Sequence, residues 1–229
     1  MRVDILTLFP AMFDGVLGES IIKRAKKKGK ADIRVHNLRD WTEDRHRKVD
    51  DKPFGGGPGM VIKPQPLFDA VSELKGRASK VVLMTPQGKR LDQAAAKKFA
   101  GAAHIIIVCG HYEGVDERFR QKCVTDEISL GDFILTGGEI PAMALVDCVV
   151  RLIPGVVGDE ESLEFESFSA GLLEYPQYTR PADFRGLKAP RVLLSGDHNK
   201  IDAWRREMAL KRTKKMRPDM YKKINKEKR

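Results

Sequence analysis

The chain has 229 residues, of which 41% are hydrophobic, and it carries a net charge of +10. That size and apolar content are enough for one large domain or two modest ones with a real core. The three cysteines have neither metal-ligand nor disulfide-framework spacing, which argues against a disulfide-stapled scaffold and favours a reducing compartment. No signal peptide precedes the first strand pattern, and the longest apolar run is too short to cross a bilayer. We therefore expect a cytoplasmic protein with no membrane contact.

Basic residues are concentrated at the C-terminal end. Residues 171–229 contain 17 Lys or Arg and 7 Asp or Glu, whereas the first 170 residues contain 25 of each kind. A basic segment of this length indicates a polyanionic partner, most simply nucleic acid. A solvated basic tail without a partner is the alternative.

Strand and helix patterns alternate through the N-terminal two thirds of the chain. Strand patterns occur at Val3–Phe9, Ala31–His36, Lys80–Met84, His104–Cys109 and, more weakly, Val124–Leu130. Helical patterns run from Pro10 to Lys28 and over Pro66–Leu74, Leu91–Phe99 and Glu139–Ile153. This alternation predicts an α/β fold in which helices cover both faces of a mainly parallel sheet.

The pattern changes near residues 154–155. Residues 159–166 are acidic and weakly periodic, as in a flexible linker, and no convincing strand alternation follows them. Helices are expected at Asn199–Arg212 and Asp219–Lys228. We therefore predict a ligand-binding domain at residues 1–160, a linker at 161–170 and a basic helical domain at 171–229.

Two glycine-punctuated loops, residues 109–117 and 130–141, each follow a strand pattern and precede a helical one. Ligands of α/β proteins bind at the carboxyl ends of strands, where such loops lie. Neither a dinucleotide fingerprint nor a P-loop is present. The apolar residues of the second loop suit an adenine ring, but spacing alone leaves a ligand loop and a structural turn equally open.

The helix expected at Glu139–Ile153 is apolar on nearly every face. A lone helix on a sheet should keep a polar side, so this helix is either buried on both sides or packed against a second subunit. Near its end, Arg151 either satisfies the helix dipole or holds a phosphate or a developing oxyanion.

Residues 37–60 have no clear periodicity and form a long connection, which suggests a functional role. His46 and Asp50 are compatible with a metal pair but lack a third ligand, so we predict no metal site. The glycine run from Gly55 would allow backbone to approach a flat base or a phosphate. Glu164 and Glu166 lie in the acidic linker, where composition alone favours a solvated loop.

Short motifs in the same order cover nearly the whole chain. They are residues 8–13, 44–47, 50–60, 86–88, 109–118, 131–142, 151–156, 167–168, 178–181 and 193–196. As an ordered set they closely resemble the bacterial tRNA (guanine-N1)-methyltransferases, the TrmD family of the SPOUT class. The resemblance implies a deep trefoil knot in the N-terminal domain and an obligate homodimer with its active site between the subunits.

The resemblance also implies the ligands. S-adenosylmethionine would be the methyl donor, and the family also uses magnesium, expected here through Glu113 and nearby groups. The matching positions for the methyl donor are Pro86, Gly110, Tyr112, Glu113, Leu130, Gly131, Asp132, Phe133, Ile134, Leu135, Gly137, Gly138 and Pro141. The substrate would be guanosine 37 of tRNA, preceded by another guanosine. Gly59, His46 and Asp50 are expected to bind it, and the C-terminal domain would grip the tRNA.

Guanine N1 carries a proton at neutral pH, so methylation needs a general base, and the charge that develops on O6 needs a cation. The resemblance assigns the cation to Arg151 and the base to Glu166. This is a departure, because the family has an aspartate at the second position; Glu164 is a weaker candidate. Two alternatives follow: a catalytically weak RNA-binding member of the fold, and an enzyme acting on ribosomal RNA or ribose 2′-OH.

Overall fold

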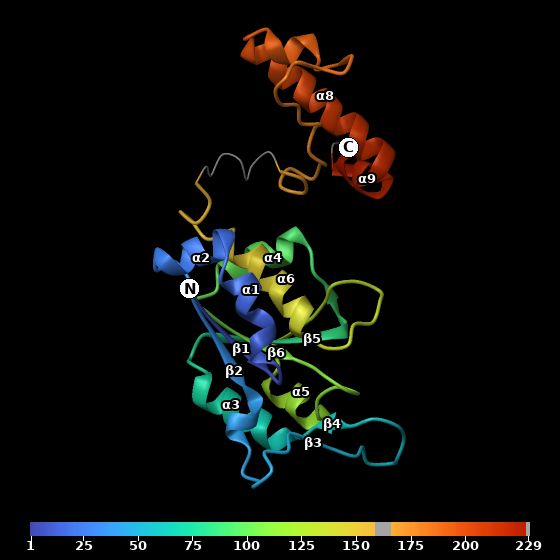
Figure 1. Ribbon diagram of the computed structural model, residues 1–229. Coiled ribbons are helices and arrows are strands. Elements are labelled where there is room, and N and C mark those ends of the chain that lie inside the picture. The colour runs from blue at the N-terminus through green and yellow to red at the C-terminus, as the bar shows by residue number, and fades with distance from the viewer. Residues whose placement is uncertain (159–165, 228–229) are drawn as a thin grey trace. The chain divides into compact units, whose positions relative to one another are not determined.

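The computed structural model describes residues 1–158 and 166–227 (Figure 1). The chain divides into two compact units, unit 1 at Met1–Gly158 and unit 2 at Asp159–Arg229. None of the described helices is both long enough and apolar enough to span a membrane.

Unit 1 is built on a five-stranded sheet in the order β2-β1-β6-β5-β7, in which every neighbouring pair is parallel. The strands are β1 (Arg2–Thr7), β2 (Asp32–Asn37), β5 (Ser79–Arg90), β6 (His104–Cys109) and β7 (Asp126–Ser129). The apolar run of β6 is buried from Ile105 to Cys109, as expected for a strand covered on both faces. The predicted α/β fold with a mainly parallel sheet is confirmed.

Helices cover both faces of the sheet. They are η1 (Pro10–Phe13), α1 (Asp14–Leu17), α2 (Ser20–Lys27), η2 (Leu38–Trp41), α3 (Pro64–Leu74), α4 (Gln93–Ala100), α5 (Glu117–Cys123) and α6 (Glu139–Val150). One core cluster joins the sheet to η1, α1, α2, α4 and α6, and a second joins it to η2, α3 and α5. Figure 1 shows these two helix groups on opposite sides of the strands.

The single helix predicted from Pro10 to Lys28 is divided into η1, α1 and α2. A Cβ at Gly18 would lie 2.6 Å from the carbonyl oxygen of Asp14, and Ser20 has a φ of 52°. The backbone therefore turns between α1 and α2, although the apolar spacing continues across the break.

β5 is longer than the predicted strand at Lys80–Met84. Its pairing with β7 shifts register between Met84 and Lys89, a bulge that carries the strand on to Arg90. A Cβ at Gly88 would lie 2.4 Å from the backbone nitrogen of Ile128, so only glycine permits this close approach.

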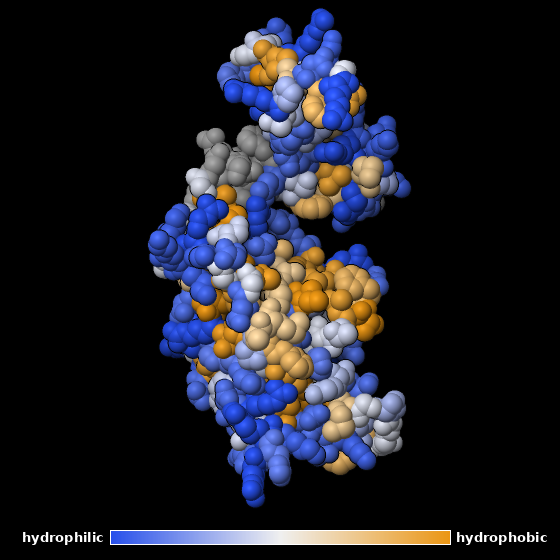
Figure 2. All heavy atoms as spheres, viewed as in Figure 1, coloured by the Kyte–Doolittle hydropathy of each residue, from blue (hydrophilic) through white to orange (hydrophobic). Residues whose placement is uncertain are grey.

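One face of α6 is buried and the other is not. Leu145, Val146 and Val149 pack into the core, while Ile140 is 51% exposed. Phe9, Met12 and Val16, on or just before η1 and α1, are also exposed, and η1 contacts α6. Figure 2 shows apolar side chains gathered on this side of unit 1. Within unit 1, α6 is therefore buried on one side only, and both explanations for the apolar helix stay predictions.

A buried polar cluster centres on Asp4, whose side chain has no solvent exposure. Its two carboxylate oxygens lie 2.7 Å from Nε2 of His36 and of His104, and Arg2 Nε also lies 2.7 Å from Oδ2. Burial raises the pKa of Asp4, but the interactions with His36, Arg2 and His104 outweigh it and lower that pKa to about 2. Asp4 is therefore a charged group stabilised inside the fold.

Unit 2 contains β8 (Asp183–Phe184), β9 (Leu187–Lys188), η3 (Arg191–Leu194), α8 (His198–Met216) and α9 (Pro218–Glu227). The antiparallel pair β8–β9 corrects the expectation that this region has no strands; two-residue strands are too short to produce an alternation. Thr213 is fully buried, and its hydroxyl donates to Ala209 O and accepts from Leu173 N. This hydrogen-bond pair ties α8 to the segment before the hairpin.

Candidate functional site

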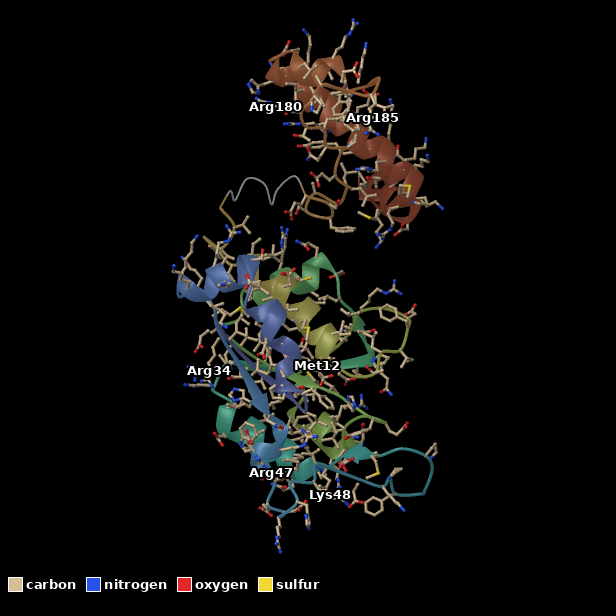
Figure 3. The ribbon with its side chains drawn as sticks, in the orientation of Figure 1. Met12, Arg34, Arg47, Lys48, Arg180 and Arg185 are labelled. Atoms are coloured by element: carbon tan, nitrogen blue, oxygen red, sulfur yellow. The ribbon has the colours of Figure 1, made fainter. Side chains whose placement is uncertain are left out.

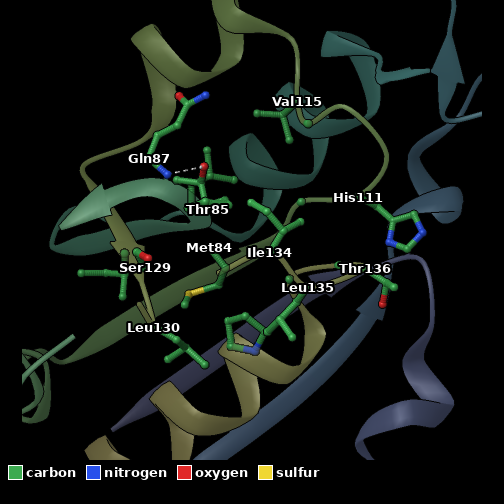
Figure 4. Close-up of a pocket in the computed structure, with 18 of the residues that line it drawn as sticks. Met84, Thr85, Gln87, His111, Val115, Ser129, Leu130, Ile134, Leu135 and Thr136 are labelled. Carbon is green, nitrogen blue, oxygen red and sulfur yellow. Dashed lines mark hydrogen bonds between the residues drawn. The ribbon is translucent and has the colours of Figure 1, made fainter. Parts of the chain in front are cut away.

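A cavity of about 570 Å³ lies in unit 1 at the ends of β6 and β7 and beside the bulge of β5 (Figure 4). Its lining comes from three segments: residues 83–87, residues 110–120 and residues 128–141. The three strands are neighbours in the sheet, so the bulge of β5 and the carboxyl ends of β6 and β7 bring the segments together. This is the usual place for a ligand in an α/β protein, and the volume suits a nucleoside-sized molecule.

The two glycine loops predicted from the sequence are joined directly. Gly138 donates its N–H to the carbonyl of Gly110 over 2.7 Å, and His111 forms a backbone bridge with Gly137. A Cβ at Gly138 would lie 2.7 Å from Cys109 Cα and 2.8 Å from Gly110 N. Because those atoms are backbone, no rotamer change relieves the clash, and glycine is needed for the start of α6 to approach the end of β6.

The cavity has apolar walls and a few polar groups. Leu130, Ile134 and Leu135 contribute aliphatic side chains beside Met84 from β5 (Figure 4). Polar groups come from Thr85, Gln87, Ser129 and Thr136. An aliphatic slot with hydrogen-bonding groups at its edge can bind a flat heterocycle joined to a polar group.

Twelve of the thirteen residues expected to hold the methyl donor line this cavity. The exception is Asp132, which is not among the lining residues and whose exposed carboxylate lies 2.9 Å from Arg90 Nη2. The methyl-donor contact expected for Asp132 stays a prediction. Sequence reasoning did not select Thr85, His111, Ser129 or Thr136, although all four lie within or next to segments that it did select.

Gly59 lies beside the cavity, whereas His46 and Asp50 do not line it. Glu113 donates its N–H to Met60 O over 3.0 Å, and Ile62 donates to Gly114 O over 2.9 Å. A Cβ on Gly59, which has a φ of 83°, would lie 2.3 Å from Glu113 Oε1. The glycine-rich segment is thus fixed against a wall of the cavity at its C-terminal end.

Glu113 and Glu117 are the carboxylates among the lining residues. Glu117 accepts hydrogen bonds from Arg120, which lower the pKa of Glu117 and raise that of the guanidinium, and Arg120 also binds Glu127. Among the described residues, no group of three or more His, Cys, Asp or Glu side chains could hold a metal ion.

Of the two expected catalytic residues, only Arg151 belongs to the same unit as the cavity, and it is not among the lining residues. Arg151 caps the C-terminal end of α6, about 15 Å along the helix axis from Pro141, which lines the cavity. Glu166 belongs to unit 2, where its carbonyl accepts from Ser169 N, and Glu164 lies outside the described residues. One chain therefore does not bring Arg151 to its own cavity.

The basic side chains of unit 2 lie beside aromatic rings. Arg185 lies over the ring of Phe184 at 5.1 Å, and Arg205 lies over Tyr175 at 5.0 Å. Arg180 and Arg185 are labelled in Figure 3. Arg185 is exposed, whereas Arg205 is partly buried and pairs with Asp202. A guanidinium next to an aromatic face suits phosphates and unstacked bases.

A parallel sheet with a cavity beside three adjacent strands, at the carboxyl ends of two of them, defines an α/β ligand-binding protein. The family profile for "tRNA (Guanine-1)-methyltransferase TrmD" matches residues 1–223. A tRNA (guanine-N(1)-)-methyltransferase of Halalkalibacterium halodurans is 57% identical over 223 residues, 96% of this chain and 91% of that protein. Proteins of that name from Geobacillus kaustophilus and Geobacter sulfurreducens are also 57% identical, with the same coverage. The chain belongs to the TrmD family of tRNA (guanine-1)-methyltransferases, and the resemblance inferred from the sequence is confirmed.

Proposed function

We propose that this protein transfers a methyl group from S-adenosylmethionine to N1 of guanosine 37 in tRNA. The observation that carries the proposal is the cavity, because twelve of the thirteen family-matched positions for the methyl donor line it. Its aliphatic walls suit the adenine ring, and the polar side chains suit the ribose and amino-acid parts. Membership in the family supports the reaction, and no observation favours the catalytically weak alternative.

When bound, S-adenosylmethionine supplies an electrophilic methyl group on a sulfonium. In the proposed reaction the N1–methyl bond forms as the sulfur–methyl bond breaks, and the N1 proton passes to the carboxylate of Glu166. Arg151 stabilises the negative charge that develops on O6. The longer side chain of Glu166, relative to the family's aspartate, displaces the carboxylate by about one bond length, a shift to which catalysis is sensitive.

We propose a homodimer whose active site combines both subunits. Arg151 is too far along α6 to serve the cavity of its own chain, which supports a second copy as the one that receives it. The exposed apolar face at Met12, Val16 and Ile140 supports the same arrangement, since a second copy would bury it. The deep trefoil knot implied by the family remains part of the proposal for the chain path around the cavity.

The basic unit 2 is proposed to bind the tRNA, supported by its charge and its arginine–aromatic pairs. We place the enzyme in the cytoplasm, because its proposed substrates occur there. The lining residues do not form a magnesium cage, since Glu117 is paired with Arg120, and no step is routed through a metal ion.

Incubation of the protein with labelled S-adenosylmethionine and a tRNA carrying guanosines at positions 36 and 37 tests the proposal. Mass analysis of the nucleosides should give N1-methylguanosine, which is lost when position 37 is changed to adenosine. A 2′-O-methyl product would indicate the alternative reaction. Binding of both ligands without product in a single turnover would indicate the non-catalytic alternative.

Two variants test the assigned roles. Arg151→Ala and Glu166→Gln should each nearly abolish methyl transfer while leaving the affinity for S-adenosylmethionine unchanged. Arg34→Ala serves as the control, because Arg34 makes an exposed pair with Asp32 on β2, at the opposite edge of the sheet from β7. Full activity in Glu166→Gln would refute the assignment of the base.

A further inference from the structure

Phe54 is the most exposed large hydrophobic side chain of those described, at 98% exposure. It lies between β3 (Asp50–Asp51) and β4 (Val61–Ile62), at the start of the glycine-rich loop. An apolar ring left in water has no structural benefit to the isolated unit, and the donor cavity does not include it. We therefore expect the Phe54 side chain to contact another molecule.

The loop holds Phe54 away from the body of unit 1. Gly55, Gly56 and Gly57 have φ values of 87°, 77° and 116°, and a Cβ on any of them would meet nothing within 4 Å. Packing therefore does not require glycine there; the left-handed backbone does. The antiparallel β3–β4 pairing fixes both ends of the loop.

The loop is next to the donor cavity. Its C-terminal end is tied to residues 113 and 114 by the hydrogen bonds of Met60 and Ile62, and Gly59 lies against Glu113, which lines the cavity. Phe54 is therefore five residues from the point where the loop meets the site of methyl transfer.

Exposed basic side chains lie on the same connecting segment, residues 37–60. Arg45, Lys48 and Lys52 make no ion pair with any described residue, and Figure 3 shows Arg47 and Lys48 at this end of unit 1. The carboxylate of the nearby Asp44 already accepts hydrogen bonds from the backbone N–H groups of His46 and Lys48, which lower its pKa. An exposed ring and unpaired cations on one connecting segment fit a single-stranded nucleic acid better than a protein surface.

We propose that Phe54 stacks on an unpaired nucleotide that flanks the target guanosine, while Arg45, Lys48 and Lys52 contact the adjoining phosphates. The inference rests on the proposed function, since a tRNA anticodon loop supplies unpaired bases on both sides of position 37. It adds a stacking contact in unit 1 to the basic surface of unit 2.

The test measures tRNA affinity by fluorescence anisotropy without the methyl donor. Phe54→Ala should weaken binding by about 5- to 100-fold, the range for loss of one base–aromatic stack, and Phe54→Trp should retain it. The effect should disappear with a tRNA that is abasic at the two nucleotides flanking position 37. Melting temperature and S-adenosylmethionine affinity should not change, because the side chain is fully exposed.

A second experiment tests the proposed phosphate contacts with a double variant that removes two positive charges. Arg45→Gln with Lys52→Gln should reduce the salt dependence of tRNA binding by about two counterions. Lys26→Gln with Lys27→Gln is the matched control, since these exposed α2 cations also lack an ion pair with described residues and lie on the opposite side of the sheet.

Three outcomes would overturn the inference: unchanged affinity in Phe54→Ala, an equal loss on intact and abasic tRNA, or conversion of a dimer to a monomer. The last would mean that the ring contacts a second copy of the chain. If the unaltered protein neither binds nor methylates the tRNA, it is the proposed function that fails.

Discussion

Gly138→Ala tests whether the joined glycine loops create the cavity. The new Cβ would lie 2.7 Å from Cys109 Cα, 2.8 Å from Gly110 N and 3.0 Å from Cys109 C, whereas ordinary contact begins at 3.4 Å. All three atoms are backbone, so the start of α6 must move away from the end of β6. That movement lengthens the 2.7 Å hydrogen bond from Gly138 N to Gly110 O.

Overpacking of this kind costs about 1–3 kcal/mol, and loss of the hydrogen bond about 1 kcal/mol more. We therefore expect the free energy of unfolding to fall by about 2–4 kcal/mol in urea titrations followed by circular dichroism. Calorimetric titration should also show loss of S-adenosylmethionine binding, because both loops of the cavity are displaced.

Gly101→Ala is the matched control. Its Cβ would come no closer than 3.6 Å to Lys98 O, so stability and ligand affinity should stay near those of the unaltered protein. If Gly138→Ala unfolds at the same urea concentration and binds the methyl donor normally, the close approach of α6 to β6 is not what forms the site.

Three further outcomes are expected. The pKa of Asp4 is lowered from its ordinary value near 4 to about 2, so its charged carboxylate stabilises the fold at pH values above 4. About 2 kcal/mol of the free energy of unfolding should therefore be lost as the pH falls from 4 to 2. The variant Asp4→Asn should lack this pH dependence. Ile140→Asp should give a monomer in sedimentation velocity and lose methyl transfer, whereas a dimer of normal activity would contradict the proposed interface. Cys109 is 2% exposed and burial raises its thiol pKa, so mass mapping should find it unlabelled by thiol reagents until the protein unfolds.

The sheet was predictable because its strands are buried on both faces. Runs such as Ile105–Cys109 have no polar alternation, and their carboxyl ends locate the loops that line the cavity. Shorter features escaped prediction: β3, β4, β8 and β9 have two residues each, which is too few for a period. The extension of β5 was hidden because its bulge places Pro86 and Gly88 inside a strand.

Residue spacing predicted only part of the candidate site. Spacing left the two loops as either ligand loops or turns, because the need for glycine at Gly138 comes from β6, which is distant in sequence. The ordered motifs, through the family resemblance, selected the lining residues. Phe54 lies within one of those motifs, residues 50–60, but the sequence did not single it out, because exposure of a side chain is a property of the folded chain.

The order of the strands has a consequence for how the protein is made. β1 pairs with β2 on one side but with β6, about a hundred residues later, on the other. During synthesis the first strand therefore keeps an open edge until residues 104–109 emerge, and β7 and the cavity loops follow later still. Such long-range parallel pairing is slow to form and leaves unpaired edges exposed meanwhile. The cavity needs the last strand as well as the earlier ones, so the proposed methyl donor would bind only a chain whose sheet is complete. Its binding would then favour fully folded molecules over partly folded ones.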